Sequence, residues 1–478
     1  MPTPTDSPSA RSSLAPGRAT RARQWLAHHK SVLLIAFAFT VMADPVSSVA
    51  YAVEAALRAL GGNLSLLLPT MAVVIGIIAV VIANYHDLVG RFPQGGGAAA
   101  ASGTAFGEGF AFLPLGALVV DFVLTIAVSI AAGASAIIAY FPVAHTIRVP
   151  LAIGLLLLVA ALTWFGHWGR ILFALMTLSF VGIGTALLVS GFAKPQVTLP
   201  PFSGHSSGIA AVAVMLAFPV GMALATGVEA PSSAIAQLGQ LDDAGRRFFG
   251  RATLWLTLLI VGGLTMGITA LAVRLGIGIP PANSTQIGDV ARAAGSPGLF
   301  AAFQAASAVL LLAAASSSFQ AGPGLLKALA RADRLDGARL GILPAWMGRT
   351  NRHHTPYWAG LVYLLVSAAV IVAAGARDQE LVLFYAVAVF LSFLAGLLAM
   401  LKFSLAEHRW RWVVVNGLGA VLVGFTLVVN LLRGYPLVSF AAALLIAGAF
   451  YWLWVRAGRP RGVSQIERIV EAEVGEEE

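Results

Sequence analysis

The sequence predicts an all-α integral membrane protein, and three observations support this fold class. Of the 478 residues, 58% are hydrophobic and 11% are charged, with a mean hydropathy of +0.85, whereas soluble domains carry about a quarter charged residues. The apolar residues form runs of about 20, long enough to cross roughly 30 Å of hydrocarbon as a helix. The runs are continuous and do not alternate with polar residues, which favours helices over a closed barrel.

Twelve apolar runs are predicted to span the membrane, and together they form one transporter domain over residues 31–456. The fourth run is the shortest and is nearly fused to the fifth. The expected spans are 31–59, 66–85, 112–140, 150–165, 169–192, 209–238, 252–275, 297–322, 356–375, 381–403, 412–432 and 436–456.

The two ends of the chain are predicted to lie in the cytoplasm. Residues 1–30 are rich in Pro, Ser, Thr and Arg and are expected to form a disordered basic arm. Residues 457–478 are expected to form a short, solvated acidic tail. With this orientation 23 of the 30 Lys and Arg residues fall on the cytoplasmic side, as the positive-inside rule requires. We therefore expect a multi-pass protein of the plasma (inner) membrane.

Several classes of function are disfavoured by composition. The chain has no Cys, which excludes disulfides and thiolate metal sites. Its nine His residues lie mainly at span ends and in loops, and no Ser–His–Asp arrangement emerges. The basic residues lie near the ends of the spans, and no basic face interleaved with aromatic residues, as a nucleic-acid-binding surface would have, is found in the sequence. We expect no enzyme, no cofactor and no nucleic acid partner; the lipid bilayer is the expected partner, and a homodimer is left open.

Three carboxylates lie at membrane depth within the predicted spans: Asp44, Asp121 and Glu229. A charge there costs at least ~2.5–3.5 kcal/mol, so such residues are usually functional and have a partner. No Lys or Arg lies near the middle of any predicted span. We therefore expect protons or an incoming cation to neutralise these carboxylates.

Hydroxyl groups accompany each of these carboxylates at helical spacing. Such oxygens suit a hard cation, although a Ser or Thr in a membrane helix often bonds its own backbone instead. Tyr385 fits either core packing or a ligand role. Glu54, near the end of its span, is expected to form a simple surface pair with Arg58. The three groups are Asp44, Ser48 and Tyr51; Asp121, Thr125 and Ser129; and Thr226 with Glu229.

Spans one and six are predicted to be broken helices. Pro45 removes a backbone donor and disfavours helical geometry at Asp44, while Gly221 and Gly227 loosen the sixth span. Transporters built from inverted repeats place such breaks at matching positions, with the substrate near the midplane between them. Carbonyl groups freed at the breaks would be additional cation ligands.

Six segments of the sequence resemble the amino acid–polyamine–organocation superfamily, over roughly residues 30–455. Within it the likeness is to KimA-type potassium uptake proteins, relatives of the Kup transporters. This resemblance implies a LeuT-like fold of twelve helices, a 5+5 inverted repeat with broken helices 1 and 6, and potassium import by K⁺/H⁺ symport. The segments are "DPVSSVAYA", "FPQGGG", "DFVLTIAVS", "TGVEA", "SSFQAGPGLLKALARADRL" and "FYAVAVF".

The resemblance also assigns roles to the candidate residues. Potassium, a monovalent cation, is expected to bind at Asp44, Tyr51 and Thr226, and protons at Asp44, Asp121 or Glu229. The remaining residues of the substrate and ion site are Thr125, Ser129 and Tyr385. Phe122 departs from the family, which carries Tyr beside the Asp.

The alternative is a proton-coupled amino-acid or polyamine permease on the same scaffold. Amino-acid recognition uses exposed backbone N–H groups for the substrate carboxylate, yet "MADPVSS" has no Gly and adds a negative charge. This argument does not exclude an organic cation without a carboxylate as the substrate. The segment "RFPQGGGAAAASGTAFG" lacks the ending of a phosphate-binding loop and is expected to be a flexible cytoplasmic loop.

Overall fold

The structure is a computed structural model that describes residues 30–165, 170–196, 207–331, 334–335, 338–339 and 341–477. All but one residue of the predicted basic arm lies outside these ranges. The described residues form helices almost throughout, as predicted, with one antiparallel pair of two-residue strands, β1 (Arg334–Leu335) and β2 (Ala338–Arg339).

Every predicted span overlaps a helical segment. In chain order the segments are α2 (Lys30–Val41), α3 (Ala43–Ser47) and α4 (Val49–Ala59); α5 (Leu64–Arg91); α7 (Phe112–Tyr140); α8 (Arg148–Trp164); α9 (Arg170–Phe192); α10 (Ser207–Gly221), η3 (Met222–Ala225), α11 (Ala230–Ala234) and η4 (Ile235–Gln237); α12 (Asp243–Leu275); α14 (Pro297–Ala330); α15 (Tyr357–Ala373); α16 (Asp378–Ala406); α17 (Trp410–Leu432); and α18 (Leu437–Arg456).

Nine segments of the described chain are long and apolar enough to cross a membrane, and α2, α8 and α15 are shorter apolar helices. The protein is therefore a multi-pass membrane protein, while the count of twelve spans and the inverted repeat stay predictions. The elements between the spans are α6 (Gly97–Phe106), η1 (Glu108–Ala111), η2 (Pro142–Ile147), α13 (Gln286–Ala294), η5 (Ala345–Gly348), η6 (Val463–Gln465) and α19 (Ile466–Glu477).

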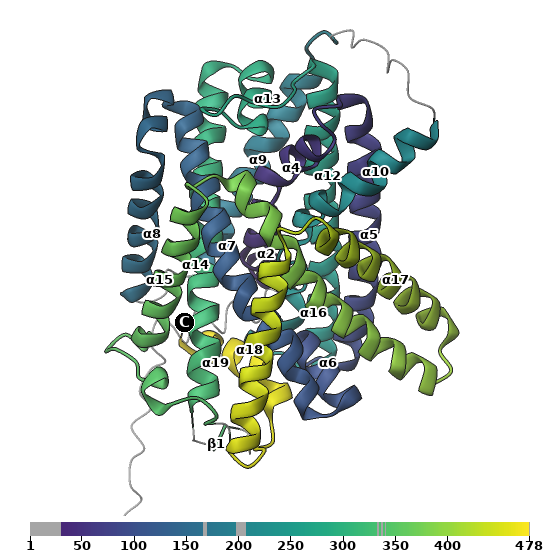
Figure 1. Ribbon diagram of the computed structural model, residues 1–478, viewed down its shortest axis with the longest axis vertical. Helices are drawn as coiled ribbons and strands as arrows, with labels where there is room; N and C mark the ends of the chain where they lie inside the picture. Colours follow the sequence, from purple (N-terminus) through teal and green to yellow (C-terminus); the bar gives the residue numbers. More distant parts are fainter. Residues whose placement is uncertain are drawn as a thin grey trace, which may run out of the picture.

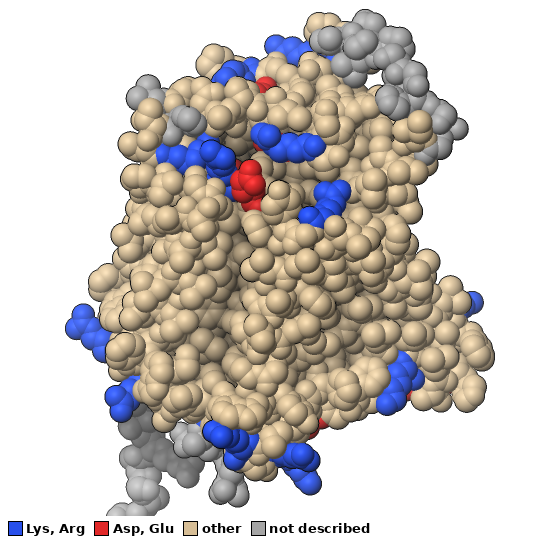
Figure 2. Space-filling view, in the orientation of Figure 1, with Lys and Arg blue, Asp and Glu red and all other residues tan. Residues whose placement is uncertain are grey.

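Helix α7 lies near the centre of the bundle, where it packs against α14, α16 and α18 (Figure 1). Helices α8 and α15 form one edge of the bundle and α17 lies at the opposite edge. On the face shown in Figure 2, Lys, Arg, Asp and Glu gather towards the two ends and leave a band without charged residues between them. Exposed apolar side chains such as Leu259 and Leu445 suit a surface in contact with lipid.

Two features of the sequence fix helix packing in this bundle. A Cβ at Gly116 would lie 2.7 Å from the backbone oxygen of Ala443, so only glycine allows α7 and α18 to come this close. Asn84 donates to Asn416 at 2.9 Å, and Asn416 donates to Ser404 at 3.1 Å. This buried chain of hydrogen bonds joins α5, α17 and α16, where no water is available to replace them.

The prediction of a flexible loop over "RFPQGGGAAAASGTAFG" is wrong. Three successive glycines with positive φ, Gly95, Gly96 and Gly97, turn the chain into α6, and this helix is almost entirely buried. Its alanines and glycines carry so little side chain that α16 and η6 pack directly against its backbone. Small residues that look like a linker in the sequence therefore form a tightly packed helix.

The prediction of a solvated C-terminal tail is also wrong. After Gly462, which has φ +102°, η6 and α19 fold back onto the bundle and contact α6, α11, η4 and α14. Ile466 is fully buried. The acidic residues of the tail form specific pairs with the bundle, described below.

Candidate cation site

Span six is broken, as predicted, at Thr226 and Gly227. Helix α10 ends at Gly221, a short 3-10 turn follows, and Thr226 is extended with φ −52° and ψ 131°. Gly227 has φ +68°, a conformation that glycine adopts at little cost. Helical hydrogen bonding resumes in α11, so several backbone carbonyls near the break lack their usual intrahelical partners.

Span one is interrupted less strongly than predicted. Its turns at Met42 and Ser48 divide α2, α3 and α4, but Ser48 keeps helical angles of φ −64° and ψ −21°. The Ser48 hydroxyl donates to the carbonyl of Pro45 at 2.6 Å and to that of Leu224 at 3.2 Å. Pro45 therefore distorts the helix without unwinding it, and a hydroxyl joins the distortion to the break in span six.

The two interrupted spans meet where Gly227 packs against Asp44. A Cβ built on Gly227 would lie 2.6 Å from Asp44 Oδ2 and 2.9 Å from Pro45 Cδ. Glycine is therefore required here for space as well as for its backbone angle. This contact places the Asp44 carboxylate directly beside the unwound backbone of span six.

Asp44, Asp121 and Glu229 line one cavity of about 110 Å³. Each has one buried oxygen, Asp44 Oδ1, Asp121 Oδ1 or Glu229 Oε2, without a hydrogen-bond partner among the described residues. The three side chains are close enough to interact electrostatically. None of the ion pairs found in the described ranges involves them, and Lys and Arg are absent from the described lining.

The predicted hydroxyl residues surround this cavity but do not line it. The Thr125 hydroxyl donates to that of Tyr385 at 3.1 Å, and Tyr385 lies within reach of Asp121. Tyr51 lies beside Thr226, whose hydroxyl donates to its own span's Ala223 carbonyl at 2.7 Å. Their roles as ion ligands stay predictions.

Ser129 is buried on α7 two turns beyond Asp121, outside the cavity. Its hydroxyl has no hydrogen-bond partner among the residues with described side chains. The Ser48 hydroxyl donates to two backbone carbonyls, as described above. The stripe of oxygens on α7 therefore reaches the cavity at Asp121 only.

Sequence reasoning missed part of the lining. The run of serines in "SSSFQAG" was the available signal for α14, but no periodic pattern marked Ser392 or the tail. Phe122, where the resemblance expects Tyr, is itself a lining residue. The missed polar residues are Ser233, Ser317, Ser318, Ser392, Glu467 and Glu471.

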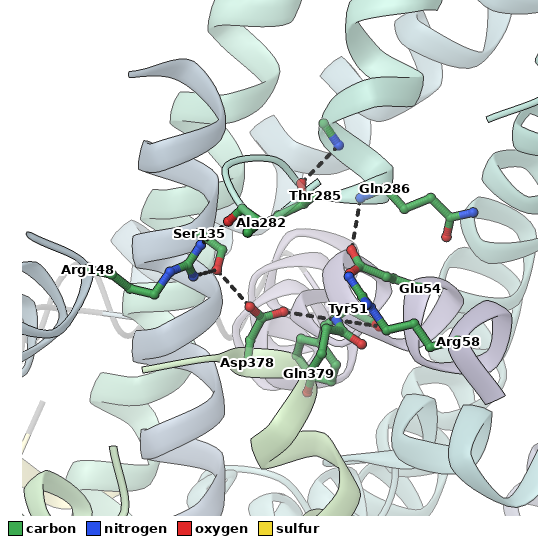
Figure 3. A network of polar contacts seen from close by, with 11 residues as sticks. Tyr51, Glu54, Arg58, Ser135, Arg148, Ala282, Thr285, Gln286, Asp378 and Gln379 are labelled. Atoms are coloured by element: carbon green, nitrogen blue, oxygen red, sulfur yellow. Dashed lines mark hydrogen bonds and ion pairs between the residues drawn. The ribbon is translucent and has the colours of Figure 1, made fainter. Parts of the chain in front are cut away.

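A polar network lies beside the start of α13 (Figure 3). Asp378, at the start of α16, accepts a hydrogen bond of 2.7 Å from Ser135 and one of 2.9 Å from Gln379. Arg148 donates to the Ser135 hydroxyl at 2.7 Å, and Gln379 reaches the Tyr51 carbonyl at 3.4 Å. These contacts join α4, α7, α8 and α16 above the cavity.

Glu54 lies in the same region and differs from the expected surface pair with Arg58. It pairs with Arg58 at 2.8 Å, as predicted, but it is only 4% exposed. Its other oxygen accepts from the backbone N–H of Gln286 at 2.9 Å, at the first residue of α13. Glu54 is thus a buried cap on a helix N-terminus, not one half of a surface pair.

The arrangement does not form a compact metal site. In the part of the chain that the structure describes, no three His, Asp or Glu residues come together as metal ligands would. The three membrane carboxylates share a cavity but are spread around it.

Comparison with known proteins places the chain in a family. Residues 32–458 match the model of the Amino acid permease family. The chain belongs to this family. The potassium transporter KimA of Bacillus subtilis (strain 168) is 28% identical over 396 residues, which are 79% of this chain and 63% of KimA. The chain thus spans under two thirds of the length of KimA.

Two solved structures of the Eremococcus coleocola manganese transporter also overlap with the chain. One is 14% identical with a TM-score of 0.48 and covers 93% of this chain and 97% of that one. The other is 13% identical with a TM-score of 0.41 and covers 89% and 95%. The family and KimA are transporters, which confirms the predicted resemblance to the superfamily and to KimA, and the prediction that the protein is not an enzyme.

Proposed function

We propose that this protein imports potassium ions together with protons. The observation that carries the proposal is the cavity lined by Asp44, Asp121 and Glu229 without a Lys or Arg among its described lining residues. Similarity to a potassium transporter supports the choice of ion. A net negative cavity inside an apolar bundle attracts cations and repels the carboxylate of an amino acid.

The electrostatics of the cavity explain why two different cations would travel together. Like charges in a medium of low dielectric constant repel strongly, so three ionised carboxylates are costly without neutralisation. A potassium ion beside Asp44 would bind the carbonyl oxygens of the span-six break and the oxygens of Tyr51 and Thr226. A proton on Asp121 or Glu229 would remove a second charge, and each cation then favours binding of the other.

The geometry also supports alternating access to this cavity. The network around Asp378 and Glu54 closes the end near α13, and α19 lies across the opposite end. In transporters of this architecture one bundle moves relative to another around a site near the midplane. Opening of the two ends in turn would carry the ions across.

Rubidium uptake in a strain that lacks its own potassium uptake systems tests the proposal. Asp44→Asn keeps the size of the side chain but removes its charge, and we expect uptake to fall to the background of the strain. Asp243→Asn is the matched control, because Asp243 is an exposed carboxylate at the start of α12 and does not line the cavity. Normal uptake by Asp44→Asn would refute the assignment.

The alternative is a proton-coupled amino-acid or polyamine permease, and the name of the matched family, Amino acid permease, is consistent with it. Competition separates the two: excess potassium should abolish labelled rubidium uptake, whereas arginine, lysine, putrescine and neutral amino acids should leave it unchanged. Strong inhibition by putrescine with weak inhibition by potassium would support the permease instead.

A further inference from the structure

The C-terminal helix α19 forms one wall of the cavity. Glu467, Val470 and Glu471 lie on one side of this helix and line the same cavity as the three membrane carboxylates. In Figure 1, α19 lies in the lower half of the view beside α14 and α18, remote from α13 at the top. The helix therefore stands between the cavity and the aqueous phase at that end.

Polar contacts hold α19 to the short helices that follow the break in span six. Ser233 on α11 donates to Glu467 Oε2 at 2.8 Å. Gln237 in η4 donates to Glu471 Oε2 at 2.5 Å. A few residues after the chain is unwound at Thr226, these two hydrogen bonds link it to α19.

A second group of contacts holds α19 to α14. Lys327 donates to Glu473 Oε2 at 2.9 Å, and Arg331 pairs with the other oxygen of Glu473. The Lys327 side chain is only 7% exposed, so this pair is shielded from water, and removal of Glu473 would leave Lys327 without this charge partner. Upstream, Ser464 is held by Glu108, whose carboxylate accepts from its backbone N–H at 3.0 Å.

We propose that α19 is the inner gate of the transporter, which closes the cavity towards the cytoplasm and undocks to release the ions. This inference rests on the proposed function and on the predicted orientation. The helix has only 12 residues. The polar contacts above attach it to two separate parts of the bundle, and Ile466, Ile469 and Val470 are buried against them. Movement of α11 relative to α14 cannot occur without breaking one set of these contacts, which couples the gate to the broken helix.

Glu467 makes the docking of this gate sensitive to pH. Burial in the docked state raises its pKa, the hydrogen bond from Ser233 lowers it, the nearby Glu471 raises it and a hydrogen bond from the Ala99 backbone lowers it, with a net pKa of about 7. Glu229 and Tyr85 also interact with it electrostatically. The side of α6 against Glu467 is formed by Gly97 and Ala99, which carry no titratable group.

In the free helix the pKa of Glu467 has its ordinary value of 4.5, and in the docked helix it is higher. Protonation of Glu467 therefore favours docking. The stabilisation of the docked helix by protonated Glu467 is complete below about pH 4.5 and is lost as pH rises through about 7. An acidified cytoplasm would hold the gate closed, which would limit a transporter that itself delivers protons to that side.

Cysteine labelling tests the gate directly, because the natural chain contains no cysteine. Ser318→Cys places a single thiol in the cavity wall. A membrane-impermeant thiol reagent is added to inside-out vesicles, and the labelling rate is measured. We expect Glu473→Gln to increase this rate at least tenfold, and a chain ending at Gly462 to increase it at least as much.

The matched control is Asp289→Asn, which removes the carboxylate of the Arg292 pair on α13, remote from α19 in Figure 1, and should leave the rate unchanged. Equal labelling in the Ser318→Cys protein and in both gate variants would overturn the proposal. Size-exclusion elution in detergent establishes that each variant is folded; should Glu473→Gln not accumulate, the truncated chain decides the outcome.

The pH test uses the same reporter thiol with Glu467 or with Glu467→Gln. The ratio of the two labelling rates cancels the pH dependence of the thiol itself. We expect this ratio to rise by up to about tenfold per pH unit between about pH 5 and pH 7 and to level off above pH 7, and a constant ratio between pH 5 and 7 would refute the role of Glu467. Labelling requires no substrate, so a gate that responds in a protein without rubidium uptake would overturn the proposed function and leave the gate intact.

Discussion

The packing of Gly227 against Asp44 yields the sharpest test of the candidate site. Gly227→Ala adds one methyl group at a position with φ +68°, 2.6 Å from Asp44 Oδ2. To reach an ordinary contact of 3.4 Å, the two groups must separate by 3.4 − 2.6, or about 0.8 Å. A displacement of this size in a group that must meet its substrate reduces function by one to two orders of magnitude. We expect rubidium uptake to fall at least tenfold.

The backbone strain of this variant needs its own control, since an L-residue in the left-handed region costs about 1–2 kcal/mol. Gly61→Ala supplies it, because Gly61 has φ +62° with nothing within 4 Å of a Cβ. Gly76→Ala, on α5 in open space and without positive φ, controls for the substitution alone. Uptake by Gly227→Ala equal to that of Gly61→Ala would show that the position of Asp44 does not depend on Gly227.

Three further substitutions test the surroundings of the site and the bundle. Tyr385→Phe removes the hydroxyl that accepts from Thr125; we expect uptake to fall about threefold to tenfold at unchanged melting temperature, and an unchanged rate would exclude Tyr385 from the site. Gly116→Val introduces methyl groups against the Ala443 backbone and should lower the melting temperature in detergent by several degrees, whereas a neutral result would contradict the close approach of α7 and α18. Asn416→Leu breaks a buried hydrogen-bond chain and should destabilise the protein by about 0.6–1.7 kcal/mol, which thermal unfolding would detect; a more stable variant would contradict the role given to this chain.

The features that the sequence predicts well are those set by local composition. Each apolar run identifies a helix because lipid leaves the backbone no other way to satisfy its hydrogen bonds. The position of Asp44, Asp121 and Glu229 in one cavity follows from the high cost of a buried charge, which leaves few sites where such residues are tolerated. The break at Gly227 follows from the single residue type that tolerates positive φ.

The features that the sequence does not predict depend on contacts between distant segments. The glycines and alanines of α6 have no hydrophobic periodicity, and their helix exists because α16 and η6 cover it. The acidic residues of α19 are typical of a solvated end until Ser233, Lys327 and Arg331 are placed opposite them. In both cases the decisive partner lies more than a hundred residues away.

In the described part of the chain, charged residues are paired at both ends of the cavity and unpaired between them. On the α13 side, Glu54 and Asp378 are paired with basic or amide groups, and on the α19 side Glu473 is paired with Lys327 and Arg331. Between them the membrane carboxylates lack such partners among the described residues. In the proposed mechanism, the paired charges would hold both ends of the cavity closed without a net charge that would trap a cation there. A cation would be held most strongly between them while both ends are shut, and would be released when either network opens and water enters.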